Sequence, residues 1–407
     1  MEQRETAVAL CAVGAEKVVS NELRKLGLKV EGSGFGKVRF HADLAGLYRS
    51  LMALRAADRV LLEAASFPAE DFDALFEGAR DVPWERLVSR GMGLAVAKVR
   101  ASRSKLRAET SVQAVVHKAV AERLCGAFRV RRLPEGEKTA ELRVYIEKDR
   151  VSLLLDISGE PLFKRGYRNE GGAAPLRETT AAAILLLSNW RRKFPLYDPF
   201  CGSGTIVIEA AMYAWDMAPG LGRRFALEDL PMANGETGEA VWTELAAKIG
   251  FDRTIRISGS DTDGRALSAA RANLTRARGL AAGGFSRRIR QGRRDDSAPA
   301  ASVQNGPADP ELRLLPMEEA RAPSAWEAGS PGFIVTNPPY GKRIGSPEEA
   351  EAIYGGMEGL GRNFPGWKLA LITSHPGFES FFGRKADSCR EITNGAIPSF
   401  LFQYERL

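Results

Sequence analysis

The feature that most constrains this chain is a regular alternation of short apolar strands with helices through residues 161–407. Each of four apolar and β-branched segments is followed by a helical pattern. These strand segments are 195–200, 255–261, 332–340 and 367–374. Short buried strands separated by helices predict an α/β fold, with a mostly parallel sheet covered on both faces. The tail at 388–405 predicts a closing hairpin through Asn394-Gly395, which would give the sheet an antiparallel edge.

The rest of the chain predicts two smaller α+β units. With 407 residues the chain is too long for one ordinary core, so two or three domains are expected. We place the small units at residues 1–65 and 66–160 and the large unit at 161–407. Inside the large unit, residues 229–240 and 291–310 are rich in small and polar residues, and we interpret both as insertions.

A glycine-rich loop follows the first strand of the large unit. Gly202 and Gly204 permit a sharp turn and let a ligand approach without a Cβ in the way. Asp198 stands at the carboxyl end of the strand, where open α/β sheets bind ligands. No GKS or GKT sequence follows, so this is not a phosphate-binding P-loop. An acid here suits a cationic ligand, such as the amino group and sulfonium of S-adenosylmethionine; an ordinary tight turn is the alternative. The cofactor-binding residues expected here are Asp198, Pro199, Cys201, Gly202, Ser203, Gly204 and Thr205.

A second acid ends the next strand. In nucleoside-binding α/β folds, an acid at this position accepts hydrogen bonds from the ribose hydroxyls. We therefore assign Asp261, with its neighbour Thr262, to the cofactor, and Asp263 to the N-cap of the following helix. The alternative is that both acids serve only as helix caps.

The segment FIVTNPPY is the sharpest signal in the chain. Proline cannot continue a central strand, so the chain must leave the sheet at its ligand-binding edge. The Asn337 side-chain oxygen and the Pro338 carbonyl can each accept one hydrogen of a base amino group, and Pro339 stiffens the loop. This would orient the nitrogen lone pair and stabilise the positive charge that develops on it. Tyr340 can stack on the base, which must be unpaired or flipped out. The motif does not separate guanine N2 from adenine N6.

Four motifs in series resemble the THUMP-containing RNA guanine-N2 methyltransferases. They are residues 165–190, 198–212, 259–274 and 337–345. The resemblance implies a ferredoxin-like domain, a THUMP RNA-binding domain and a Rossmann-like catalytic domain that uses S-adenosylmethionine. Bacterial members of this family act on 23S ribosomal RNA and archaeal relatives on transfer RNA. The chain is similar to the guanine-N2 half of a larger fused bacterial enzyme.

Further residues are expected to contact RNA or the cofactor. A basic cluster lies between a strand and a helix, and the resemblance adds two arginines of the segment RGYR to the expected RNA contacts. These RNA-binding residues are Lys98, Arg100, Arg103, Lys105, Arg107, Arg165 and Arg168. The family's acid for the cofactor adenine has no clear match here. Glu318 or Glu319 is the best substitute, with Asp295 or Asp296 as alternatives.

Composition narrows the class of partner. The net charge of +7 and the pI of about 9.2 favour a polyanionic partner. The four cysteines contain no CxxC pair and there are three histidines, which argues against a zinc site and a disulfide scaffold. No apolar run is long enough for a membrane span. We expect a cytoplasmic, metal-free monomer that binds RNA.

Three alternative functions stay open or are set aside. Methylation of adenine N6, or of transfer RNA, uses the same chemistry. A non-catalytic RNA-binding assembly factor could keep the fold, although Asn337 and the loop glycines are present. A nicotinamide dehydrogenase would need GxGxxG after the first strand, which CGSGTI does not match.

Overall fold

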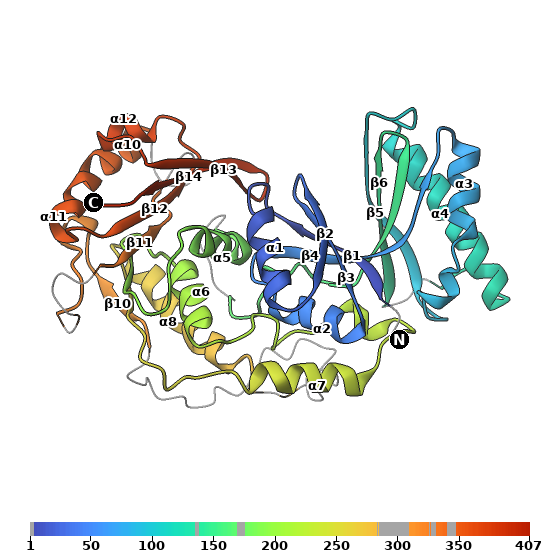
Figure 1. The fold of residues 1–407 in the computed structure, drawn as a ribbon, viewed down its shortest axis with the longest axis horizontal. Helices are drawn as coiled ribbons and strands as arrows, with labels where there is room; N and C mark the ends of the chain where they lie inside the picture. The colour runs from blue at the N-terminus through green and yellow to red at the C-terminus, as the bar shows by residue number, and fades with distance from the viewer. Residues whose placement is uncertain are drawn as a thin grey trace.

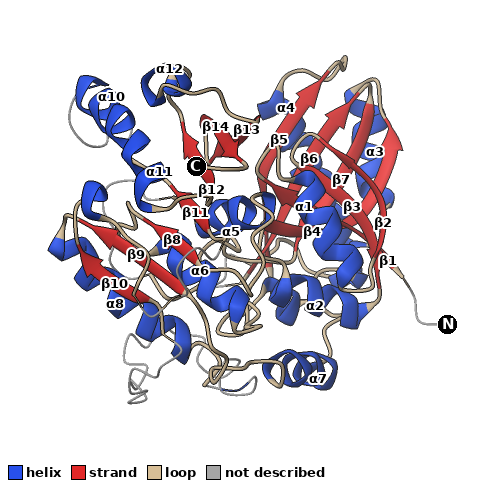
Figure 2. Cartoon of the chain, turned by 60° about the vertical axis from the view of Figure 1, so that its left-hand side comes forward, coloured by secondary structure: helices blue, strands red, loops and turns tan. Residues whose placement is uncertain are grey.

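Two seven-stranded sheets organise the chain (Figures 1 and 2). The computed structural model describes residues 4–134, 138–168, 176–282, 284, 309–324, 326, 331–339 and 347–407. No helix in these ranges is long and apolar enough to cross a membrane. The two sheets are called the N-terminal sheet and the C-terminal sheet below.

The N-terminal sheet runs in the order β2-β3-β1-β4-β7-β6-β5. Its strands are β1 Glu5–Cys11, β2 Lys29–Gly34, β3 Lys37–Ala42, β4 Ala57–Pro68, β5 Gly93–Ser102, β6 Thr139–Glu147 and β7 Arg150–Asp156. Its helices are α1 Glu16–Lys25, α2 Leu44–Ala53, α3 Phe72–Asp81 and α4 Glu109–Phe128. The first half, β1-α1-β2-β3-α2-β4, is the ferredoxin-like arrangement predicted for this region. The expected boundary at residue 65 falls inside β4, which pairs with both β1 and β7, so the two expected small units share one sheet.

One face of the N-terminal sheet carries all four helices. Ala7 lies opposite Leu62, Leu62 opposite Leu155, and Leu155 opposite Leu142, so these four side chains share a face. All four belong to the main hydrophobic core, together with buried residues of the helices. Alternate residues point to the other face, where Val8, Leu61 and Leu154 form a small separate cluster.

The C-terminal sheet confirms the α/β prediction. Its order is β10-β9-β8-β11-β12-β14-β13, with parallel pairing from β10 to β12 and antiparallel pairing of β14 with β12 and β13. Its strands are β8 Leu196–Asp198, β9 Ile257–Asp261, β10 Glu311–Leu314, β11 Phe333–Thr336, β12 Lys368–Thr373, β13 Ser388–Asn394 and β14 Ile397–Tyr404. The helices of this part of the chain are α5 Glu178–Leu187, α6 Thr205–Ala214, α7 Gly235–Ala246, α8 Gly264–Gly279, α10 Pro347–Gly356, α11 Leu360–Asn363 and α12 Phe378–Phe382, of which α7 packs against α2.

Two local predictions need adjustment. Asn394 pairs with Ile397, so the two loop residues of the closing hairpin are Gly395 and Ala396, one position later than expected. Residues 235–240, expected as part of an insertion, form the start of α7, whose N-cap Asn234 accepts a hydrogen bond from the Thr237 amide. The other expected insertion, 291–310, lies outside the described residues apart from 309 and 310.

Candidate active site

Three parallel strands bring the expected site residues to one edge of the C-terminal sheet. Strand β8 lies between β9 and β11, and all three run in the same direction. Their carboxyl ends therefore place Asp198, Asp261 and Asn337 at one edge, where the loops that follow can form a shared site. Strand β10 adds a fourth carboxyl end beside β9, and the exposed Glu318 and Glu319 follow it in a short 3-10 helix whose first residue, Met317, is buried.

The glycine loop has the backbone that its sequence predicts. Gly202 and Gly204 have φ angles of +51° and +83°, which residues with a Cβ rarely adopt. Helix α6 begins directly after Gly204, at Thr205. A Cβ added at Gly202 would meet no atom within 4 Å, whereas one at Gly204 would lie 3.0 Å from Ala270. Gly202 thus faces open space, and Gly204 allows α8 to pack closely.

The two acids at the carboxyl end of β9 make different contacts. Asp263 accepts a hydrogen bond of 2.8 Å from the Arg265 amide and caps α8, as predicted. Asp261 accepts 2.8 Å from the Gly202 amide and 2.9 Å from the Asp263 amide. Its carboxylate therefore links the glycine loop to the start of α8. Thr262 lies between the two acids, on the exposed side of this turn.

Asp198 lies deeper than the sequence suggested. It is 1% exposed, and its Oδ1 accepts a hydrogen bond of 2.7 Å from the Thr336 hydroxyl and one of 3.1 Å from the Phe200 amide. Burial raises the pKa of Asp198 to about 7, and the negative charge of Asp261 adds to this shift. The side chain therefore anchors the glycine loop to β11. Its contact with a cofactor cation stays a prediction.

Asn337 keeps a buried oxygen without a partner. Among the described residues no donor bonds its Oδ1, although the atom is shielded from solvent. A buried acceptor left in this way costs free energy unless a ligand or water supplies the donor. Pro338 is buried beside it, and the Pro339 carbonyl accepts a hydrogen bond of 3.3 Å from the Tyr354 hydroxyl. Tyr340 lies outside the described residues.

Tyr354 was missed by the sequence reasoning. It stands on α10, is fully buried, and its hydroxyl also lies 3.0 Å from the Thr373 hydroxyl at the end of β12. The ring thus connects the proline loop to the neighbouring strand. Only its apolar position within a helical pattern was visible in the sequence, and that predicts burial rather than a contact with the loop.

The other residues predicted to bind the cofactor in this loop make contacts within the protein or are buried. Cys201 is buried, and Ser203 presents its carbonyl to the Asn273 side chain at 3.1 Å. Pro199 follows Asp198 directly and leads into the loop. The alternative adenine acids Asp295 and Asp296 lie outside the described residues. No group of three or more His, Cys, Asp or Glu in the described part of the chain could hold a metal ion.

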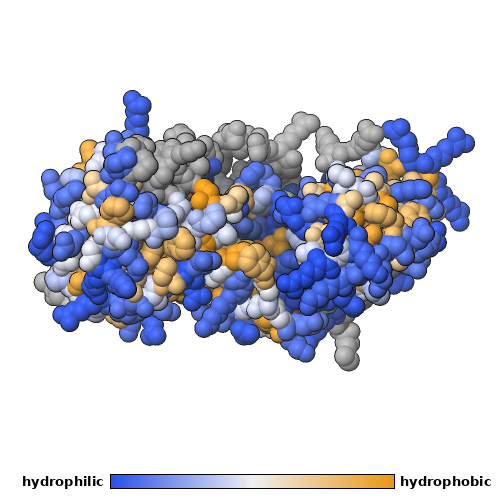
Figure 3. Space-filling model, turned by 90° about the horizontal axis from the view of Figure 1, so that it is seen from above, coloured by the Kyte–Doolittle hydropathy of each residue, from blue (hydrophilic) through white to orange (hydrophobic). Residues whose placement is uncertain are grey.

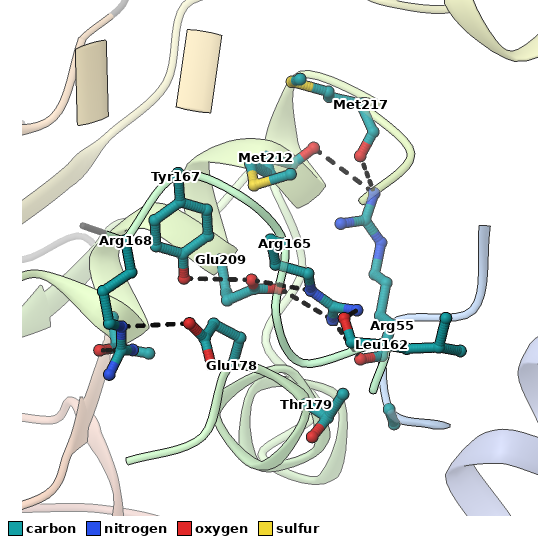
Figure 4. Close-up of polar contacts among 12 residues, drawn as sticks. Arg55, Leu162, Arg165, Tyr167, Arg168, Glu178, Thr179, Glu209, Met212 and Met217 are labelled. Atoms are coloured by element: carbon teal, nitrogen blue, oxygen red, sulfur yellow. Dashed lines mark hydrogen bonds and ion pairs between the residues drawn. The ribbon is translucent and has the colours of Figure 1, made fainter. Parts of the chain in front are cut away.

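Arg165 corrects an expectation. Its side chain was predicted to contact RNA, yet it is buried and pairs with Glu209 on α6 at 3.3 Å (Figure 4). It also donates to the Leu162 carbonyl at 2.8 Å and to the Arg55 carbonyl. A guanidinium enclosed in this way cannot reach an RNA phosphate. Its role is internal, where it ties the α2–β4 junction of the N-terminal sheet to the helix that follows the glycine loop.

Arg168 lies at the same junction but closer to the cofactor loop. It forms an ion pair of 3.1 Å with Glu178 (Figure 4). It also donates a hydrogen bond of 2.7 Å to the hydroxyl of Thr205, the first residue of α6. Its side chain is 14% exposed. These contacts stabilise the start of α6, and an additional contact with RNA stays a prediction.

The basic cluster lies on β5 and the loop that leads to α4. Arg100, Arg103, Lys105 and Arg107 are exposed and Lys98 is half-buried. Two of them have acidic partners, since Arg100 lies 3.1 Å from Glu109 and Lys105 lies 2.5 Å from Glu70. Both pairs are exposed, so they contribute little to stability and leave the side chains accessible.

Comparison with known proteins identifies the family. Residues 165–283 and 318–402 match the RMKL-like methyltransferase domain, and residues 6–61 match the RlmL ferredoxin-like domain. YpsC of Bacillus subtilis, which is provisionally designated an RNA methyltransferase, is 33% identical over 98% of this chain and 95% of its own length. The chain belongs to the RMKL-like methyltransferase family.

Two further proteins are similar to this chain over nearly its whole length. The ribosomal RNA large subunit methyltransferase K/L of Syntrophotalea carbinolica is 34% identical over 96% of this chain, which spans about half, 52%, of that enzyme. The crystal structure of SMU.472, provisionally designated a methyltransferase and bound to SAH, superposes with a TM-score of 0.83 at 33% identity. That match covers 100% of this chain and 99% of the other. As an RMKL-like methyltransferase, this chain uses S-adenosylmethionine as its cofactor.

The edge of the C-terminal sheet fits that cofactor. Gly202 faces open space at the start of α6, and the acid Asp261 stands at the next strand end. The partnerless oxygen of Asn337 lies at the adjacent strand end on the other side. These groups offer a loop position without a side chain, a carboxylate acceptor and an amide acceptor at one edge of the sheet.

Proposed function

We propose that this chain methylates the exocyclic N2 amino group of a guanine in RNA, with 23S ribosomal RNA as its substrate. The observation that carries the proposal is the buried Oδ1 of Asn337, which has no hydrogen-bond donor among the described residues and lies at the edge that holds the glycine loop. An acceptor in this position suits an amino group, whereas a neutral amide oxygen is too weak a base to take the proton that a ribose hydroxyl must lose and cannot activate a carbon.

Each residue of the edge has a role in this proposal. Asp261 and Thr262 would hold the ribose of the cofactor, Glu318 or Glu319 its adenine, and the glycine loop its methionine part. S-adenosylmethionine supplies an electrophilic methyl group on a sulfonium. Asn337 and the Pro338 carbonyl would each accept one amino hydrogen, so that the nitrogen lone pair points at this methyl group. Tyr340 would stack on the base.

The choice of RNA rests on charge and on relatives. The net charge of +7 favours a polyanion, and the basic cluster of the N-terminal sheet is accessible. The K/L relative is named for the RNA of the large ribosomal subunit.

A transfer assay tests the substrate class. Purified protein and labelled S-adenosylmethionine are incubated with separate transcripts of 23S RNA and of transfer RNA, and with double-stranded DNA. We expect label in 23S RNA from the parent protein, and none from Asn337→Ala, which should still bind the cofactor in calorimetry. Label in transfer RNA alone would show that transfer RNA, and not 23S RNA, is the substrate. Label in DNA alone would refute RNA methylation.

A further inference from the structure

Two side chains from outside the glycine loop hold it at Ser203 and at Thr205, the first residue of α6. The side-chain amide of Asn273 on α8 donates a hydrogen bond of 3.1 Å to the Ser203 carbonyl. The bond of 2.7 Å that Arg168 donates ends on the Thr205 hydroxyl. Gly202 stays open, because a Cβ added there would meet no atom within 4 Å. The loop is therefore fixed at Ser203 and at the start of α6, and it is free to meet a ligand at Gly202.

Asn273 is fixed in turn by an arginine three residues further along α8. Its side-chain oxygen accepts a hydrogen bond of 2.6 Å from Arg276, which also donates one of 2.8 Å to the Tyr167 carbonyl. The Asn273 amide thus accepts from a guanidinium and donates to a carbonyl, so its partners decide its orientation. Asn273 is 1% exposed, which leaves it unable to touch a ligand at the sheet edge. Any effect of this side chain on the cofactor must pass through the loop.

Both contacts with the loop lead back to the segment 165–168, which contains Arg168 and Tyr167. The same segment is joined to the N-terminal sheet, since Arg165 donates a hydrogen bond to the Arg55 carbonyl between α2 and β4. The contacts that fix the glycine loop are therefore themselves fixed to the other half of the protein. We call this set the loop frame. It consists of residues 165–168, Asn273 and Arg276.

The charged groups of the loop frame are paired inside the protein. On the face that Figure 3 shows, hydrophilic side chains lie at the surface with small apolar areas among them. Arg165 is instead 1% exposed, and it pairs with Glu209 on α6 at 3.3 Å. Arg168 pairs with the buried Glu178 at 3.1 Å (Figure 4). A buried charge cannot leave its partner without a large loss of free energy, so the segment 165–168 is held in one position against α6.

We propose that Asn273 and Arg168 are positioning residues for S-adenosylmethionine, which hold the glycine loop in its binding shape before the cofactor arrives. Glycine gives a free chain many conformations, so an unheld loop would lose much entropy on closing around a ligand. A loop that is already held does not take this free energy from its contacts with the cofactor. Because the loop frame is joined to the N-terminal sheet, that sheet contributes to cofactor affinity without touching the cofactor. The inference concerns the cofactor alone and holds for any methyl acceptor.

Calorimetric titration of the full chain with S-adenosylmethionine tests the inference, and urea unfolding shows that each variant is folded. Asn273→Leu keeps the approximate volume of the side chain and removes its bond to the Ser203 carbonyl. Arg168→Lys keeps the charge beside Glu178, but one ammonium cannot occupy the two positions at which guanidinium nitrogens meet Glu178 and Thr205. Each variant should raise the Kd for the cofactor about 3- to 10-fold.

Arg223→Lys is the matched control. Arg223 is also buried, and it donates hydrogen bonds of 2.8 and 2.7 Å to the carbonyls of Pro161 and Glu160, a few residues before the loop frame. Its replacement loosens the same linker without a contact to the glycine loop. Arg223→Lys should lower the free energy of unfolding, as Arg168→Lys does, and leave the Kd for the cofactor unchanged.

A double variant tests whether Arg168 acts through Thr205. Thr205→Val removes the hydroxyl that accepts the bond, so Arg168→Lys combined with Thr205→Val should lose no more affinity than the weaker-binding single variant. Additive losses would mean that Arg168 meets the cofactor by another route, and they would overturn its role as a positioning residue. An unchanged Kd in folded Asn273→Leu or Arg168→Lys, or an equal rise in Arg223→Lys, would likewise overturn the inference.

Discussion

The Thr336 hydroxyl donates a hydrogen bond of 2.7 Å to Asp198, and this contact joins the two strands that carry the site. Asp198 ends β8 before the glycine loop, and Thr336 ends β11 before Asn337. Both partners are buried. This side-chain contact adds to the pairing of β8 with β11 and fixes the cofactor loop to the proline loop, so that motifs 138 residues apart form one site.

The buried carboxyl of Asp198 predicts a dependence of stability on pH. Its pKa is raised from 3.8 to about 7, so between these values the folded protein holds the proton that the unfolded chain releases. The free energy of unfolding that this group contributes is fully present below pH 3.8 and is lost as the pH rises toward 7. Asp198→Asn cannot ionise, so it should gain roughly 1–4 kcal/mol over the parent across this window. Urea unfolding without cofactor at pH 5 and pH 8 checks this, and an equal difference at both pH values would contradict it.

Asp261 and Asp263 form a matched pair for testing cofactor binding. Asp261→Asn loses a charged acceptor at the expected ribose position, and it should weaken S-adenosylmethionine binding by about tenfold or more. Asp263→Ala removes only the cap of α8, so it should cost about 1 kcal/mol of stability and leave the affinity unchanged. Calorimetric titration of both variants measures this. Equal losses of affinity would show that Asp261 acts only through the packing of the loop.

Tyr354 is expected to act as a positioning residue for the proline loop. Tyr354→Phe removes the hydroxyl that contacts the Pro339 carbonyl and Thr373, so kcat should fall several-fold while the KM for the cofactor stays unchanged. Tyr404→Phe is the control, because it removes a similarly buried hydroxyl that donates to the Arg384 carbonyl at 3.0 Å. Both variants should lose about 0.5–1.5 kcal/mol of stability. An equal fall in kcat for Tyr404→Phe would show that Tyr354 does not position the proline loop.

The Arg165–Glu209 pair predicts a large stability effect in the interior. Glu209→Gln would leave the guanidinium buried without its counter-charge, at a cost of about 3–5 kcal/mol. The control is Glu244→Gln, which breaks two pairs of 2.8 Å near the surface, with Arg49 and with Lys248, each worth about 0–1 kcal/mol. Urea unfolding compares the two variants. If Glu209→Gln lowers the free energy of unfolding no more than the control does, then the Arg165–Glu209 pair does not hold the two sheets together.

Much of the fold could be predicted because it rests on local patterns. The alternation of apolar strands and helices predicts the parallel sheet directly, and proline after a strand predicts where that strand ends. Helix α7 was hidden because its first residues, GETGEA, have the composition of a loop. Its position is decided by the cap at Asn234 and by packing against α2, which the sequence does not display.

The side-chain roles that the sequence did not show depend on contacts between distant segments. Arg165 looks like any exposed basic residue in RGYR, and only its approach to Glu209, 44 residues away, makes it internal. Tyr354 and Asp198 likewise acquire their roles from partners on other strands. The sequence motifs show which residue types stand at the sheet edge, whereas the depth and partner of each side chain follow from tertiary packing.

Identification of the methylated nucleoside tests the central claim most directly. Under-modified 23S RNA is incubated with the protein and S-adenosylmethionine, digested to nucleosides and analysed by mass spectrometry. The account predicts N2-methylguanosine, formed by the parent protein and absent with Asn337→Ala. N6-methyladenosine as the product, or N2-methylguanosine formed equally well by Asn337→Ala, would contradict it.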